Sequence, residues 1–400
     1  MNPNSITTEA DRCVKCGLCL PQCPTYKLTQ DEGDSPRGRI SLIQAVMTDQ
    51  IPEPHTRFHL DRCLVCRACE TACPSGVRYG FLIDAIRQKS RQGLLTGLAN
   101  AAVASLPYRR ITRSLLNIYL KPPLRRILRW LGGKTVRRLD SLLPNAISTE
   151  RLVSRTTAPD QPRGRVALFT GCVTGLLERQ TLAAAIQVLE HCHYEVIIPE
   201  NQGCCGAIHG HSGNPDKAHK LGDNNLNAFN PLSVEAIITC ASGCGAQLQE
   251  YGLHGLDLQH PVMDISEFLL KSADIGANVL GKLDKSVLVH TPCTMKNVMK
   301  SEHAVAGLLK KIPGLQLEAL ALTDCCGSAG SYMLTQPVIA DQLREPAIEI
   351  LRAKRPDILV TSNTGCAMHL RAGIVQASLP IEVCHPVELI ARQLKIANSP

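Results

Sequence analysis

The residues best suited to chemistry in this chain are its 19 cysteines, most of which fall into repeated clusters. Two runs near the N-terminus share the spacing C-x2-C-x2-C-x3-C followed by proline, and they are displaced from each other by 50 residues. Their members are Cys13, Cys16, Cys19 and Cys23, and then Cys63, Cys66, Cys69 and Cys73. Because thiolates are soft ligands, four of them in each short run predict a bound metal centre.

This spacing is typical of bacterial ferredoxins that bind two 4Fe–4S clusters. The first three cysteines of a run hold one cluster, and the fourth, after a longer gap, ligates the other cluster. We therefore expect two crossed ligand sets: Cys13, Cys16, Cys19 and Cys73 for one cluster, and Cys63, Cys66, Cys69 and Cys23 for the second. Structural zinc is the alternative, but zinc sites prefer two separated C-x2-C pairs.

Two arginines, Arg37 and Arg39, lie between the runs at the start of a predicted helix. They are candidates for offsetting the negative charge of a cluster. The alternative is that they are solvated or pair with nearby acids.

A second repeat fills the C-terminal half of the chain, where two "CCG" triplets occur. Three cysteines recur after 121 residues and a fourth after 122, which gives two sets: Cys172, Cys204, Cys205 and Cys244, and Cys293, Cys325, Cys326 and Cys366. Apolar runs such as "VALFTGC" and "VLVHTPC" predict buried parallel strands, with helical segments between them. Since ligand sites gather at the carboxyl ends of such strands, we expect each set to meet in one cleft.

The identity of the centre in each cleft stays open between an iron–sulfur cluster, zinc and a redox-active pair of adjacent cysteines. His369, three residues after Cys366, has ligand-like spacing and joins the second set as a candidate. His209, His211 and His290 lie near the same loops, but packing is the commoner role of such histidines. The three remaining cysteines, Cys192, Cys240 and Cys384, are expected to be small buried hydrophobes. The alternative for Cys240, which lies close to Cys244, is a role as a substitute ligand.

These patterns predict an α+β multidomain protein. An α-helical, ferredoxin-like domain with two 4Fe–4S clusters precedes two pseudo-repeated α/β cysteine-rich units with parallel sheets. The expected segments are the ferredoxin-type domain at 1–90, a basic amphipathic helical segment at 91–153, a linker at 154–165, and cysteine-rich units at 166–280 and 281–400.

The net charge of +8 arises from the basic segment, because residues 91–140 carry eleven Lys or Arg and a single acid. This localisation, together with an aromatic content of 3%, argues against nucleic acid as a partner. Around Leu124–Leu131 the leucines and isoleucines fall largely on one helical face and the arginines on others. Such a helix either lies in a membrane interface or packs on the protein's own domains or a partner. We expect neither a signal peptide nor a transmembrane helix.

Several longer strings carry a resemblance to a known family: "PRGR" (36–39), "DRCLVCRACETACPSGVRYG" (61–80), "ASGCGAQL" (241–248), "CCGSAGSY" (325–332) and "TGCAMHL" (364–370). The chain resembles iron–sulfur electron-transfer subunits related to heterodisulfide reductase, and within them the iron–sulfur subunits of bacterial glycolate oxidase. In the wider family each unit usually ends in C-x2-C, whereas Gln247 and His369 hold the second position here.

The resemblance implies a complex in which flavin-containing subunits oxidise glycolate to glyoxylate, while this chain passes electrons towards a quinone or another acceptor. It also implies a cytoplasmic protein in peripheral contact with the inner membrane. The sequence motifs are consistent with this division, because the chain has no dinucleotide-binding glycine motif, P-loop or Ser/His/Asp set. We therefore expect substrate oxidation to occur in another subunit. The alternatives are a relay subunit for lactate or glycerol 3-phosphate dehydrogenase, and a non-enzymatic iron–sulfur regulatory or scaffold protein.

Overall fold

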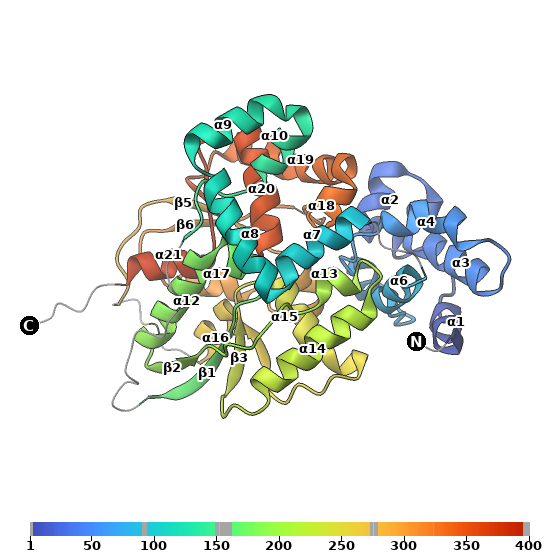
Figure 1. The fold of residues 1–400 in the computed structure, drawn as a ribbon, viewed down its shortest axis with the longest axis horizontal. Helices are drawn as coiled ribbons and strands as arrows, with labels where there is room; N and C mark the ends of the chain where they lie inside the picture. Colours follow the sequence, from blue (N-terminus) through green and yellow to red (C-terminus); the bar gives the residue numbers. More distant parts are fainter. Residues whose placement is uncertain are drawn as a thin grey trace, which may run out of the picture.

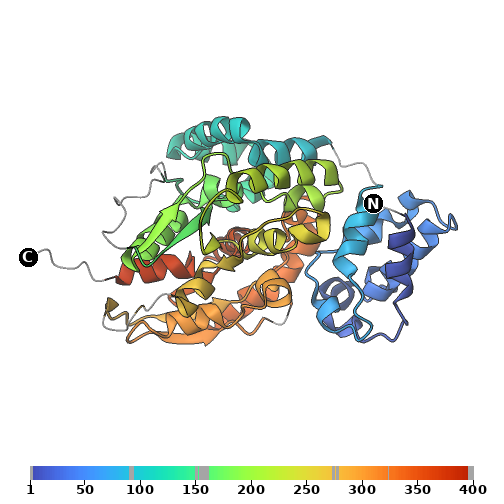
Figure 2. The same cartoon turned by 90° about the horizontal axis from the view of Figure 1, so that it is seen from below.

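The computed structural model describes residues 3–89, 94–148, 152, 162–272, 275, 279–322 and 324–394. Figure 1 shows a helical N-terminal domain, a group of four helices, and two α/β units. Figure 2, seen from below, shows the N-terminal domain at one end of the molecule, beside both units. None of the helices in these ranges combines the length and hydropathy that a membrane span requires.

Short helices build the N-terminal domain, because two cysteine loops interrupt the chain. Ser35 caps the longest of these helices by accepting a hydrogen bond from the Gly38 amide at 2.9 Å. Ile40, Ile43 and Val46 of this helix are buried, as their helical spacing predicts, and pack with the last helix of the domain. The elements are α1 (Pro3–Asp11), η1 (Leu20–Gln22), α2 (Pro24–Thr29), η2 (Glu32–Asp34), α3 (Pro36–Met47), α4 (Glu53–Asp61), α5 (Ala68–Thr71) and α6 (Tyr79–Arg87).

The basic segment forms four helices, α7 (Leu94–Ala104), α8 (Leu106–Tyr119), α9 (Pro122–Leu131) and α10 (Gly133–Ser141). Some of its arginines attach these helices to the α/β units. Arg109 and Arg113 of α8 donate to the carbonyls of Gly171 and Gly175, and Arg138 of α10 pairs with Asp341 at 3.1 Å. The basic residues of this segment therefore serve partly as structural anchors.

The first cysteine-rich unit is a four-stranded parallel sheet in the order β2-β1-β3-β4. Its strands are β1 (Gly164–Phe169), β2 (Tyr194–Ile197), β3 (Ala236–Thr239) and β4 (Val262–Asp264). Its helices are α11 (Val173–Leu177), α12 (Arg179–His191), α13 (Ala207–Gly210), α14 (Pro215–Phe229), α15 (Ser242–Gln249), η3 (Tyr251–His254) and α16 (Ile265–Lys271).

The second unit repeats this topology with the strand order β6-β5-β7-β8, also fully parallel. Its strands are β5 (Ser286–His290), β6 (Gln316–Ala319), β7 (Ile358–Thr361) and β8 (Glu382–Cys384). Its helices are η5 (Met295–Met299), α17 (Ala304–Leu309), α18 (Tyr332–Thr335), α19 (Pro337–Lys354), α20 (Thr364–Gln376) and α21 (Pro386–Gln393).

The two sheets share one apolar core, because alternate residues of each central strand point to opposite faces. Val166 of β1 and Val287 of β5 face this shared core together with helices of both units. Ala167 of β1 and Leu288 of β5 face away from it, towards two separate clusters, of which the first contains all four repeated cysteines of its unit and the second contains Cys326 and Cys366. Strand parity thus determines which side chains meet the cysteines.

The predicted fold class is confirmed: a helical dicluster domain is followed by two α/β repeats with parallel sheets. The strands β4, β6 and β8 were not predicted, because they are three or four residues long and lack a long apolar run. Residues 154–161 of the expected linker lie outside the described ranges.

Candidate metal centres

The first cysteine run surrounds a small hollow in the N-terminal domain. Five cysteines line this hollow: Cys13, Cys16, Cys19 and Cys73, together with Cys69 of the second run. The first four are the members of the first crossed set, so the fold brings the distant Cys73 to the first loop. The donor set therefore fits a cluster held by four thiolates.

Both cysteine loops curl in the same way around their sulfur atoms. In the first loop Lys15 and Gly17 have positive φ angles of 58° and 87°, and in the second Val65 and Arg67 have 51° and 61°. Such left-handed residues between right-handed ones turn successive amide groups inward, a geometry that favours anionic clusters. The Val65 amide donates to the Cys63 sulfur at 3.4 Å. The second loop therefore already presents a backbone donor to a thiolate.

The second crossed set also converges. Burial raises the pKa of the Cys66 and Cys69 thiols well above the ordinary range, and the neighbouring thiols of Cys63 and Cys23 raise it further. Cys23 thus lies with the second run although it belongs to the first. A metal centre would relieve this repulsion, because it binds thiols in the deprotonated form.

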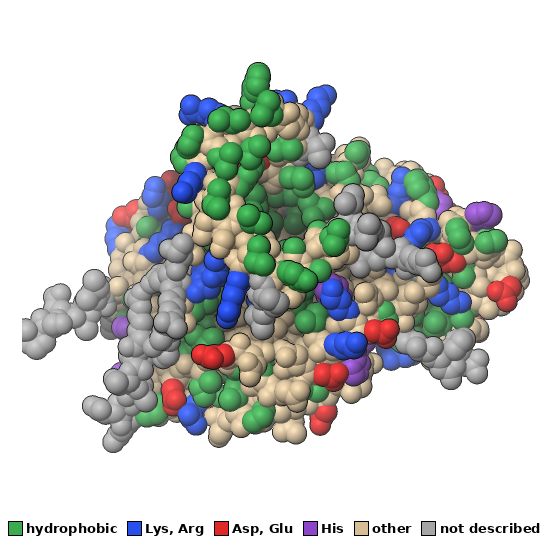
Figure 3. Space-filling model, viewed as in Figure 1, with side chains coloured by type: hydrophobic (Ala, Val, Ile, Leu, Met, Phe, Trp, Pro, Cys, Tyr) green, Lys and Arg blue, Asp and Glu red, His purple; other side chains and the backbone are tan. Residues whose placement is uncertain are grey.

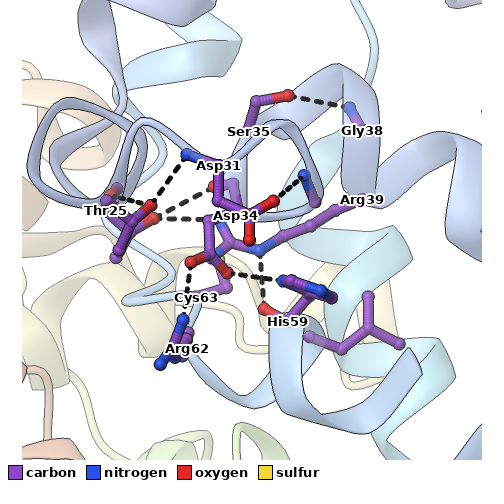
Figure 4. A network of polar contacts seen from close by, with 12 residues as sticks. Thr25, Asp31, Asp34, Ser35, Gly38, Arg39, His59, Arg62 and Cys63 are labelled. Carbon is purple, nitrogen blue, oxygen red and sulfur yellow. Dashed lines mark hydrogen bonds and ion pairs between the residues drawn. The ribbon is translucent and has the colours of Figure 1, made fainter. Parts of the chain in front are cut away.

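A buried ion-pair network supports the second set (Figure 4). The Arg39 guanidinium donates to Thr25 Oγ1 at 3.1 Å, to the His59 carbonyl at 2.7 Å and to Cys23 Sγ at 3.9 Å. It pairs with Asp34 at 3.3 Å, where the side-chain exposures are 1% and 0%. Arg39 therefore combines the two alternative roles that the sequence suggested: it pairs with an acid, and it places positive charge beside a candidate ligand.

Arg37 differs from Arg39, although only one residue separates them. It pairs with Glu32 at 2.7 Å and donates to the Lys15 carbonyl at 3.3 Å, while its side chain stays 32% exposed. Solvent screens such a pair, so its contribution to stability is small.

In the first cysteine-rich unit, all four repeated cysteines lie beyond the carboxyl ends of strands. Cys172 follows β1, Cys204 and Cys205 follow β2, and Cys244 lies in the first turn of α15 after β3. Hydrogen bonds between neighbouring thiols run from Cys172 through Cys204 and Cys205 to Cys244. The bond with Cys204, together with burial, raises the pKa of Cys172. The pKa of Cys205 is lowered by its bond with Cys204 but raised overall by its bond with Cys244 and by burial. The sheet therefore gathers a four-thiol set, as strand-end placement predicted.

The second unit gathers its set in the same way. Cys293 follows β5, Cys325 and Cys326 follow β6, and Cys366 lies in α20 after β7. The sulfur atoms of Cys293 and Cys325 are 3.9 Å apart, and neighbouring thiol contacts continue through Cys326 to Cys366. Both four-thiol sets fit a metal centre by ligand number and softness.

The glycine that ends each "CCG" triplet has a conformational role. Gly206 and Gly327 have φ angles of +94° and +83°, and a Cβ there would lie 3.0 Å and 2.5 Å from the carbonyls of Ala218 and Ala340. A larger residue would push α14 or α19 away from the paired cysteines.

Each four-thiol set has a buried arginine beside it. Arg109 of α8 donates to the Gly171 carbonyl, next to Cys172, and Arg344 of α19 donates at 3.1 Å to the His369 carbonyl, in the helix that carries Cys366. Together with Arg39 in the N-terminal domain, these guanidinium groups place positive charge next to thiols whose deprotonation burial opposes. Sequence reasoning missed Arg109 and Arg344, because their proximity to cysteine depends on helices packed from elsewhere in the chain.

The candidate histidines have separate positions. His369 Nε2 bonds the Ala340 carbonyl at 3.0 Å, and its buried Nδ1 has no hydrogen-bond partner. His211 pairs with Asp84 at 3.0 Å, and His209 is buried in α13. The imidazole that meets thiols is that of His290, where one ring nitrogen and the sulfurs of Cys326 and Cys366 all lie within 4.8 Å of one another. The sequence did offer a signal for this position, because His290 lies two residues after Leu288 in one strand and the two side chains therefore share a face.

The three remaining cysteines lie in the shared core. Cys192, Cys240 and Cys384 are buried among aliphatic side chains of both units. The charges that act on Cys240 are those of Asp264 and Glu388, not of another thiol. Cys240 is therefore placed as a core residue rather than as a substitute ligand.

The second loop of the N-terminal domain contacts the second unit directly. Asn297 Nδ2 donates to the Cys66 carbonyl at 2.7 Å, and the Tyr332 hydroxyl donates to the Arg62 carbonyl at 3.0 Å. Cys66 also packs in one apolar cluster with Cys293 and Cys325. Two candidate centres that are far apart in sequence are thus neighbours in the fold.

Family models match both halves of this architecture. Residues 9–77 match a 4Fe-4S dicluster domain, and residues 166–249 and 287–371 each match a cysteine-rich domain. The fold and its thiol sets therefore define an iron–sulfur protein with a dicluster domain and two cysteine-rich repeats.

Similar proteins narrow this class. The glycolate oxidase iron-sulfur subunit of Escherichia coli strain K12 is 34% identical over 92% of this chain and 93% of its own length. A "Probable glycolate oxidase iron-sulfur subunit" of Bacillus subtilis strain 168 is 31% identical over 96% of this chain and 93% of its own length. This chain belongs to the family of glycolate oxidase iron–sulfur subunits, which confirms the resemblance seen in the sequence.

More distant proteins share parts of the architecture. The lactate utilization protein A of Shouchella clausii is 27% identical over 56% of this chain and 98% of its own length. A hypothetical protein from Helicobacter pylori matches the fold with a TM-score of 0.55 at 12% identity, over 98% of this chain and 73% of that chain. The second match shows a shared fold alone.

Proposed function

We propose that this chain is the electron-relay subunit of a glycolate-oxidising complex. Flavin-containing subunits would oxidise glycolate to glyoxylate, and this chain would pass the electrons towards a quinone or another acceptor. The observation that carries the proposal is the contact between the Cys66 loop and the Cys293–Cys325 pair, because it sets a dicluster domain against a second thiol centre. The names of the two family members, both iron–sulfur subunits of glycolate oxidase, support the substrate.

We further propose that the crossed cysteine sets hold two 4Fe–4S clusters and that the cysteine-rich units hold additional metal centres. Iron–sulfur clusters, when bound, supply one-electron transfer. The chain's own residues supply the thiolates, exclude water by burial and offset negative charge through Arg39, Arg109 and Arg344. Burial and nearby hydrogen bonds are the features by which a protein adjusts a cluster's potential.

The exposed helices suggest where the complex meets a membrane. Four large apolar residues of α8 and four of α9 are exposed, reaching 80% at Trp130, and we call them together the exposed apolar strip: Tyr108, Ile111, Leu115, Ile118, Ile127, Leu128, Trp130 and Leu131. Figure 3 shows apolar side chains gathered over this region with Lys and Arg side chains beside them. We propose that the strip lies on an anionic lipid surface, because apolar residues flanked by cations favour such an interface.

The test of the relay function is purification with its partners, followed by dye-linked assays on glycolate, lactate and glycerol 3-phosphate. The isolated chain should reduce no dye with any of the three substrates, and added flavin subunits should restore turnover with glycolate. Preference for lactate would favour the lactate relay, towards which the Shouchella clausii relative points. Glycolate oxidation by the isolated chain would contradict the proposal.

A further inference from the structure

The two cysteine-rich units match in topology and in thiols but differ at one position on the central strand. His290 ends β5 of the second unit, and Phe169 ends β1 of the first. Their strand partners correspond, because Phe169 is in register with Thr239 and His290 with Thr361. One structural position therefore holds a hydrocarbon ring in the first unit and an imidazole in the second.

In the second unit this position points at thiols. Alternation along β5 puts Val289 into the shared core and turns His290 to the side occupied by Cys326 and Cys366. One imidazole nitrogen and both sulfurs lie within 4.8 Å of one another, and the His290 side chain is only 3% exposed. Three potential donors thus converge in a water-poor space.

A neighbouring hydroxyl fixes the ring. His290 Nδ1 and Thr361 Oγ1 are 2.9 Å apart, so Nε2 is the ring nitrogen that remains available to a metal ion. Histidine ligands in proteins almost always have such an outer partner, which sets the tautomer and the orientation of the ring. Thr239, the corresponding residue of the first unit, donates instead to the Met263 carbonyl at 3.4 Å.

In the first unit the same position offers no donor. The Phe169 ring contacts the ring of Phe229, with centroids 6.0 Å apart. A Cβ built on Gly171 would lie 3.5 Å from Phe169 Cε1 and 3.6 Å from Cys244 Sγ, so the ring edge and the sulfur flank the same small space. A hydrocarbon ring therefore lies beside Cys244, which corresponds to Cys366 in the second unit.

We infer that His290 is a nitrogen ligand of the metal centre in the second unit, which makes that centre a mixed thiolate–imidazole site, whereas the first unit binds through thiolates alone. The inference rests on the proposal that the second unit holds a metal centre. His369, the histidine favoured by spacing, is less suited to this role, because among the described residues the imidazole grouped with the sulfurs of Cys326 and Cys366 is that of His290. His290 also adds a donor to a unit in which His369 replaces the second cysteine of C-x2-C.

The experiment uses the full chain, purified anaerobically with its clusters and labelled with 15N-histidine. Pulsed electron paramagnetic resonance of the reduced and oxidised protein should detect a strong coupling from labelled histidine. His290→Phe copies the residue of the first unit and should abolish this coupling. His369→Gln is the matched control, since it copies Gln247 of the first unit, and it should keep the coupling.

A second variant protects the test against misfolding. His290→Cys replaces the nitrogen donor with a thiolate, so it should lose the histidine coupling yet retain the iron content of the unaltered chain. The dicluster signals and the circular dichroism spectrum report on folding in each variant. Loss of the coupling only in His369→Gln, or no such coupling in the unaltered chain, would overturn the inference.

Failure of the underlying proposal gives a different result. Cys326→Ser should lower the metal content per chain, measured as both iron and zinc, if the second unit holds a metal centre. Unchanged iron and zinc in Cys326→Ser would contradict the metal centre itself, and His290 with it. Iron loss in Cys326→Ser without histidine coupling in the unaltered chain would contradict only the role of His290.

Discussion

Replacement of Arg39 by methionine tests whether the buried ion pair stabilises the dicluster domain. The substitution retains much of the side-chain length but leaves the Asp34 carboxylate, which is fully buried, without one of its partners. Removal of one member of a buried pair costs about 3–5 kcal/mol. Asp34 would keep Arg62 at 2.9 Å and His59 at 3.1 Å, so we expect the lower end, about 3 kcal/mol.

For a domain of this size, each kcal/mol corresponds to about 4 °C or more in the unfolding temperature, so the domain should unfold at least about 12 °C earlier. The assay is anaerobic scanning calorimetry combined with loss of the visible cluster absorption on heating. Arg37→Met is the control, because it removes a partly exposed pair from the same helix and should leave the transition nearly unchanged.

The double variant Arg39→Met/Asp34→Asn should recover part of the lost stability, since it leaves no unpaired carboxylate. Equal shifts in Arg39→Met and Arg37→Met, or a double variant no more stable than Arg39→Met, would refute the assignment of a stabilising buried pair.

The other predictions concern ligation, the membrane and pH. Cys23→Ser should deplete the cluster of the Cys63 set and spare that of the Cys13 set, while Cys73→Ser should do the reverse. Paramagnetic resonance and iron analysis measure which cluster is lost, and loss of the cluster of the variant's own run would contradict crossed ligation. Arg126, Lys134 and Arg137, all exposed, changed together to Glu should abolish a salt-sensitive binding to anionic liposomes, and binding equal to that of the unaltered chain would contradict the lipid contact. Arg125 is left intact, because it pairs with the buried Asp140 at 2.6 Å. Burial raises the pKa of Glu178 from 4.5 to about 7, so its contribution to stability is present below pH 4.5 and lost as the pH rises towards 7. The stability of the unaltered chain relative to Glu178→Gln should therefore fall across that range, and a constant difference in unfolding free energy would contradict the shift.

Features that depend on local spacing can be predicted from the order of residues. Four cysteines in a short run dictate the ligands a loop can offer, and a proline directly after Cys23 begins α2. Apolar runs such as 166–169 and 287–289 predicted the central strands, because parallel strands buried on both faces are rich in apolar residues without alternation. The repeat offset of 121 residues then implied two units of one fold.

Tertiary structure decided which partners meet across long separations in the chain. Spacing along a helix favoured His369, but the fold turned His290 towards Cys326 and Cys366, because alternation on a strand and the position of its neighbours set the direction of a side chain. The charge of Arg39 was visible in the sequence, yet its burial depends on Asp34, His59 and the Cys23 loop closing around it. The contact of Cys66 with Cys293 joins residues more than two hundred positions apart, which no local pattern encodes. Likewise, only the packing of α8 and α10 on the units shows that some arginines of the basic segment are anchors and that the apolar side of α9 remains exposed.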